Sequence, residues 1–192
     1  MSPFEFITVL ISIILGLGIT TILTGVAERI KHFHNTKLFT PYVIWISIVF
    51  MLHIHEWWNT YTLQSIEVWS LPMFLFILLY PITLYVLAHL LFPSNNDNQF
   101  DARDFYFENY RRYYVIAIAL LVLGILHNVF IEHLNIRTQI GQVISLAIVT
   151  VFLISKTRKE IIHTIAAGVL LIILVSLIVK NGTLINQYVK SS

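Results

Sequence analysis

Six long stretches without a charged residue constrain this chain more than any other feature of its sequence. They cover residues 6–27, 38–55, 69–93, 113–131, 138–155 and 161–179. An α-helix rises about 1.5 Å per residue, so stretches of this length match the roughly 30 Å hydrocarbon core of a bilayer. We therefore predict an all-α fold, a six-span transmembrane helix bundle that forms a single integral membrane domain over residues 1–192. The fifth stretch is the weakest, because it is short and contains Gln142 and Ser145.

The composition excludes a soluble globular fold. Of the 192 residues, 57% are hydrophobic and 11% are charged, and the mean hydropathy is +0.80, whereas about a quarter of the residues in a soluble domain are charged. Cysteine is absent, which excludes disulfides and thiolate metal sites. The sequence also lacks a phosphate-binding glycine loop, a Gly-x-Ser-x-Gly elbow and a His-Glu-x-x-His helix, so a non-enzymatic role is favoured.

The positions of the basic residues predict the orientation in the membrane. Nine of the twelve follow the first, third and fifth spans: Arg29, Lys31, Lys37, Arg103, Arg111, Arg112, Lys156, Arg158 and Lys159. Because cytoplasmic loops retain positive charge, these loops are expected in the cytoplasm and both termini outside. Trp57, Trp58 and Trp69 flank an outer turn, where aromatic rings favour the interface. This sorting of charge by side also argues against a nucleic-acid-binding patch.

The polar segment 94–112 is predicted to form a short surface helix on the cytoplasmic face. Its acidic residues Asp97, Asp101, Asp104 and Glu108 follow helical spacing and form one solvated stripe. Phe100, Phe107 and Tyr110 are then available to lie in the membrane interface.

Small residues recur every four positions in the first span, at Ser12, Gly16, Thr20 and Thr24. This spacing places them on one helix face and permits close approach of a neighbouring helix. We expect the bundle to pack through this face.

Ionisable and amide side chains gather at similar depth in the outer half of the spans. Those that form a candidate ion or proton route are Glu5, His53, Glu56, His127, Asn128 and Glu132. Polar groups at membrane depth are costly, so they are the first place to look for function. Two interpretations of the group stay open: hydrogen bonds between helices without any ligand, and a route for a proton or small cation that enters from outside.

A haem or metal site is the third interpretation. His53 and His127 could ligate haem b through both axial positions, with Gly124 leaving room for the ring, and His89 and His163 could form a second pair near the opposite face. A di-iron or zinc centre from His53, Glu56, His127 and Glu132 is a further alternative, although no paired Glu-x-x-His motif supports it.

Several local motifs resemble those of an uncharacterised family of small bacterial multi-span integral membrane proteins. They are Gly16-Leu-Gly-Ile-Thr20, Trp57-Trp58, Leu79-Tyr-Pro81 and Phe105-Tyr-Phe-Glu-Asn-Tyr-Arg-Arg112. The resemblance implies a location in the bacterial inner membrane and carries over neither an activity nor a site residue.

The sequence thus favours a small cation or proton channel or carrier, or the membrane subunit of a complex. Electron transfer through haem b is the alternative. The lipid bilayer is the expected partner, with a homo-oligomer or a membrane complex as further possibilities.

Overall fold

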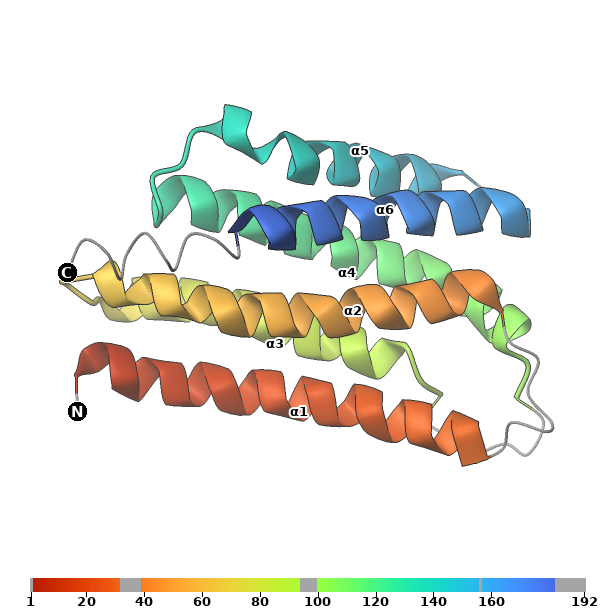
Figure 1. The fold of residues 1–192 in the computed structure, drawn as a ribbon, viewed down its shortest axis with the longest axis horizontal. Helices are drawn as coiled ribbons and strands as arrows, with labels where there is room; N and C mark the ends of the chain where they lie inside the picture. The colour runs from red at the N-terminus through yellow and green to blue at the C-terminus, as the bar shows by residue number, and fades with distance from the viewer. Residues whose placement is uncertain (1, 32–38, 94–99, 156, 182–192) are drawn as a thin grey trace.

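The computed structural model describes residues 2–31, 39–93, 100–155 and 157–181. These residues form six antiparallel helices in one bundle (Figure 1). The helices are α1 (Pro3–Lys31), α2 (Thr40–Asn59), α3 (Leu71–Leu90), α4 (Ala102–Phe130), α5 (Ile140–Ile154) and α6 (Glu160–Asn181). Two short 3-10 helices, η2 (Thr60–Ser65) and η3 (Ile136–Gln139), follow α2 and precede α5. The predicted all-α bundle is confirmed.

Five of the six helices are long and apolar enough to cross a membrane. The exception is α2, whose most apolar stretch is less apolar than those of the other five. Within α2, His53, His55 and Glu56 lower the mean hydropathy, although its 20 residues match the length of a span. The segment expected to be weakest, α5 together with η3, is among the five. These helices show a multi-pass membrane protein, and six spans are consistent with them.

The two ends of the bundle differ in composition. The C-terminal ends of α1, α3 and α5 lie at one end of the bundle (Figure 1), which we call the basic end because it carries Arg29, Lys31, Arg103, Arg158 and Lys159. The opposite end, which carries Trp57, Trp58 and Trp69, is the tryptophan end. Lys37 and Lys156 lie outside the described residues.

Helix α1 packs at the edge of the bundle, against α2 and α3, whereas α6 packs against α2 and α5. The expected packing face of α1 was wrong. Gly16, Thr20 and Thr24 are exposed, and no atom lies within 4 Å of a Cβ built on Gly16. The bundle instead contacts the face that includes Ile11, Leu15, Gly18 and Ile22, because burying Ile and Leu removes more apolar surface from solvent than burying a stripe of Gly, Ser and Thr.

Helix α4 begins in the polar segment, which does not form a separate surface helix. The Asp101 side chain caps α4 by accepting hydrogen bonds from the backbone N–H groups of Arg103 (2.8 Å) and Asp104 (3.1 Å), and the helix then continues through its apolar part to Phe130. The predicted acidic stripe is exposed at Asp101, Asp104 and Glu108, but Phe107 and Tyr110 are buried within the bundle rather than placed at an interface. Asp97 lies outside the described residues.

We expect Asp101→Ala to lower the free energy of unfolding by about 1 kcal/mol, because it leaves two N-terminal N–H groups of α4 without their acceptor. Asp101→Asn keeps an acceptor oxygen and should unfold like the wild type. Thermal unfolding of the detergent-solubilised protein, followed by circular dichroism, measures both. An equal loss in the two variants would contradict the capping role.

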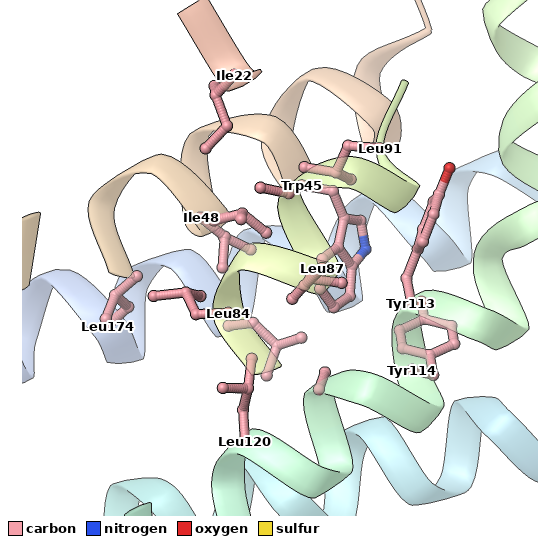
Figure 2. Packing of buried hydrophobic residues seen from close by; sticks show 14 of the residues in the cluster. Ile22, Trp45, Ile48, Leu84, Leu87, Leu91, Tyr113, Tyr114, Leu120 and Leu174 are labelled. Carbon is pink, nitrogen blue, oxygen red and sulfur yellow. The ribbon is translucent and has the colours of Figure 1, made fainter. Parts of the chain in front are cut away.

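An aromatic layer fills the bundle near the basic end. It consists of Phe39, Tyr42, Trp45, Tyr106, Phe107, Tyr110, Tyr113, Tyr114 and Phe152, around His163. The Trp45 ring lies edge-on to Tyr114, with ring centroids 5.3 Å apart. Figure 2 shows Trp45 beside Leu87 and facing the two tyrosines of α4, Tyr113 and Tyr114. The layer joins α2, α4 and the start of α6 into one packed unit.

Candidate functional site

Among the described residues, two cavities lie near the tryptophan end of the bundle and a third extends from there toward the basic end. The vestibule, of about 300 Å³, is lined by His55, Trp58, Asn59, Tyr61, Thr62, Asn128, Glu132, Leu134, Thr138, Gln139, Gln142, Leu177 and Lys180. The carboxylate cavity, of about 50 Å³, is lined by His55, Glu56, Asn59, Thr60, Leu63, Tyr80, Gly124, His127, Asn128, Glu132 and Gln142. The apolar cavity, of about 110 Å³, lies deeper and is lined mainly by Leu, Ile and Val together with Trp45, His55, Tyr80, Ala117, Gln142 and Ser145.

Glu132 reaches both the vestibule and the carboxylate cavity from the turn that ends α4. The turn is tight, with the Glu132 N–H donating to the His127 carbonyl (3.4 Å) and His133 at φ 54°, the left-handed conformation that often follows a helix. The Thr62 hydroxyl donates to the Glu132 carboxylate (3.0 Å), and His127 Nε2 lies 3.9 Å from the same oxygen. These contacts fix the carboxylate at the boundary between the two cavities.

Glu56 contributes the second carboxylate from the last turn of α2. It is half-buried, and within the described parts of the chain its carboxylate has no hydrogen-bond partner. A carboxylate withdrawn from bulk water without a partner is unfavourable in its charged form. Glu56 therefore gains from any proton or cation that enters the carboxylate cavity.

An amide network links α4 to η3 and α5 beside the carboxylates. The Asn128 Nδ2 group donates to Gln142 Oε1 (3.1 Å) and to Gln139 Oε1 (3.3 Å). Gly124 lies one turn below Asn128, and a Cβ built on it would lie 3.4 Å from Gln142 Nε2. The Gln142 amide and the Tyr80 ring therefore already occupy the space beside Gly124 that a cofactor ring would need.

The structure brings four of the six candidate route residues together: Glu56, His127, Asn128 and Glu132. Sequence analysis missed His55, Tyr80 and Gln142, which line the carboxylate cavity as well. In the sequence, Gln142 stands out only as a polar residue within an apolar span. Its spacing of three from Gln139 was an available signal, because it places two amides on one helix face opposite Asn128.

Glu5 and His53 line none of these three cavities. Glu5 forms a capping box with Ser2, in which the Ser2 N–H donates to the Glu5 carboxylate (2.8 Å) and the Glu5 N–H donates to the Ser2 hydroxyl (3.2 Å). His53 Nδ1 donates to the Val49 carbonyl (2.8 Å), and its Nε2 edge faces Gly18 of α1. His53 is thus a packing residue between α1 and α2, on a different side of α2 from the cavities.

The histidines proposed as haem ligands have other surroundings. His53 Nε2 is closed in by Gly18, whereas His127 faces the carboxylate cavity, so no axial pair is preformed. At the basic end, His163 Nε2 donates to the Thr157 carbonyl (3.0 Å) and Nδ1 accepts from the Tyr106 hydroxyl (3.0 Å). Both ring nitrogens of His163 are occupied, and these residues do not fit a two-haem arrangement.

A preassembled metal site is equally unsupported. In the described portion of the chain, no three His, Asp or Glu side chains converge on a point where they could share a metal ion. His127 and Glu132 come near each other, but Glu56 reaches the cavity from another helix.

Comparison of the chain with protein-family models, with curated proteins and with solved structures found no match.

Proposed function

We propose that this protein is a carrier or channel that takes up a small cation or a proton at the tryptophan end. The observation that carries the proposal is the carboxylate cavity: Glu56 and Glu132 both line it, and its lining contains neither Lys nor Arg. Two acidic groups in a cavity that no Lys or Arg lines create a negative potential that attracts cations. The vestibule shares Glu132 with this cavity and supplies the approach.

The proposed location is the bacterial inner membrane, with the tryptophan end outside. The support is the concentration of Lys and Arg at the basic end, which matches the positive charge of cytoplasmic loops. Cations would then enter from outside the cell. Labelling of single cysteines, placed in the cysteine-free chain at Gln64 and Arg158, with a membrane-impermeant reagent on intact cells tests this orientation.

We expect Glu56→Gln to lower cation flux at least about tenfold, because it removes the charge while keeping the shape of the side chain. Glu132→Gln should have a smaller effect, since the Thr62 hydroxyl can still bond to the amide oxygen. The measurement is uptake of protons, Na⁺ and K⁺ into liposomes that contain the purified protein, driven by a membrane potential and followed with entrapped dyes.

Glu67→Gln is the matched control, because Glu67 is exposed at the same end and lines none of the three cavities. Its flux should equal that of the wild type for every cation. Wild-type flux in Glu56→Gln, or the same loss in Glu67→Gln, would contradict the proposed function.

A further inference from the structure

We propose that the carboxylate cavity and the apolar cavity form one amphipathic site whose ligand is an organic ammonium ion with a short alkyl chain of about four carbons. This inference rests on the proposed function and adds the chemical class of the cation. Its basis is the juxtaposition of two cavities of opposite character inside the same bundle.

The first step is that the two cavities adjoin. His55, Tyr80 and Gln142 line both of them, so the two spaces border the same three side chains. They come from α2, α3 and α5, respectively. The Gln142 amide is held at this junction by Asn128, which gives the junction a defined polar edge.

The second step concerns the charged end of the site. Glu56 and Glu132 supply negative charge where an ammonium group would lie, and Trp58 and Tyr61 line the vestibule on the way in. Aromatic faces attract ammonium ions through their ring quadrupole. Lys180 also lines the vestibule, but it is exposed there and lines neither inner cavity.

The third step concerns the apolar end. Beyond the junction, side chains such as Leu52, Leu120 and Leu174 surround about 110 Å³ of space. A cavity of about 150 Å³ accommodates benzene, so this one accommodates a chain of about four carbons. A bare metal ion would lose its hydration there without compensation, whereas an alkyl chain gains from leaving water.

The test is a chain-length series of alkylammonium ions, from methyl to hexyl, titrated calorimetrically into the full-length protein in nanodiscs, with empty nanodiscs subtracted. The association constant should rise about fourfold for each added methylene, about sixtyfold from methyl to butyl. It should level off at hexyl, because the apolar cavity is then full. A flat series would overturn the inference.

Two variants separate the ends of the site. Ala117→Leu adds carbon atoms inside the apolar cavity, so it should abolish the dependence on chain length while methylammonium still binds. Val149→Phe, from α5, fills the same cavity and replaces Ala117→Leu if that variant does not fold. Glu56→Gln should weaken every member of the series by the same factor. An unchanged chain-length dependence in a folded filling variant would overturn the inference.

Failure of this inference and failure of the proposed function give different results. If no alkylammonium ion binds but Glu56→Gln still reduces the flux of protons, Na⁺ or K⁺, the further inference fails alone. If flux of the inorganic cations does not depend on Glu56 while the chain-length series behaves as expected, the site binds ammonium ions but the transport proposal fails.

Discussion

Gly18→Ala is expected to destabilise the bundle by about 1–3 kcal/mol, whereas Gly16→Ala, two residues away on the same helix, should be neutral or slightly stabilising. A Cβ at Gly18 would overlap the His53 ring. That ring is completely buried and its other edge is held by the hydrogen bond to the Val49 carbonyl, so it cannot withdraw. The overlap must therefore separate α1 from α2.

Gly16 supplies the control, because nothing lies within 4 Å of the corresponding position. Alanine is the better helix former by about 1 kcal/mol, and that preference acts unopposed there. The midpoints of thermal unfolding of the two variants and the wild type, in the same detergent, measure the difference. Similar midpoints for the two alanine variants would mean that α1 does not pack on His53 as described.

His163→Ala is expected to lower the free energy of unfolding by about 3–5 kcal/mol. The substitution removes a fully buried ring, leaving a cavity among Tyr106, Tyr110 and Phe152, and it deprives the Thr157 carbonyl of its donor. Cavity formation and an unsatisfied buried polar group each contribute a few kcal/mol in such cases.

His89→Ala is the matched control at the same end of the bundle. His89 is exposed, with a 3.4 Å contact to the Thr21 hydroxyl and an edge contact with Tyr85, so its loss should change stability by less than about 1 kcal/mol. Unfolding by increasing sodium dodecyl sulfate in mixed micelles compares the two. If His89→Ala is as damaging as His163→Ala, the aromatic layer is not the stabilising element that its packing indicates.

Hydropathy predicted the helices well because each must bury its backbone polar groups and expose apolar side chains to lipid. It failed where one helix passes from polar to apolar surroundings. The aromatic residues Tyr106, Phe107 and Tyr110 stand among charged residues, so the sequence pattern favoured an interfacial helix. Only the positions of α2 and α6 show that these rings have partners inside the bundle.

The candidate site was predicted in part for a related reason. Helical spacing shows only which residues share a face of one helix. It does not show which neighbour that face meets. His53 therefore seemed equivalent to His127, whereas the structure turns it toward α1. In the same way, Gly16 and Gly18 look alike in sequence, and only the approach of α2 distinguishes them.

If a solute crosses this bundle, the aromatic layer limits how fast it passes. The apolar cavity reaches Trp45, and beyond it the rings around Tyr114 and His163 are packed in contact across α2, α4 and α6. A solute that continued to the basic end would have to wait for these helices to separate, and collective helix movements take microseconds to milliseconds. Turnover would then saturate with solute concentration and depend steeply on temperature, as for an enzyme with a slow opening step.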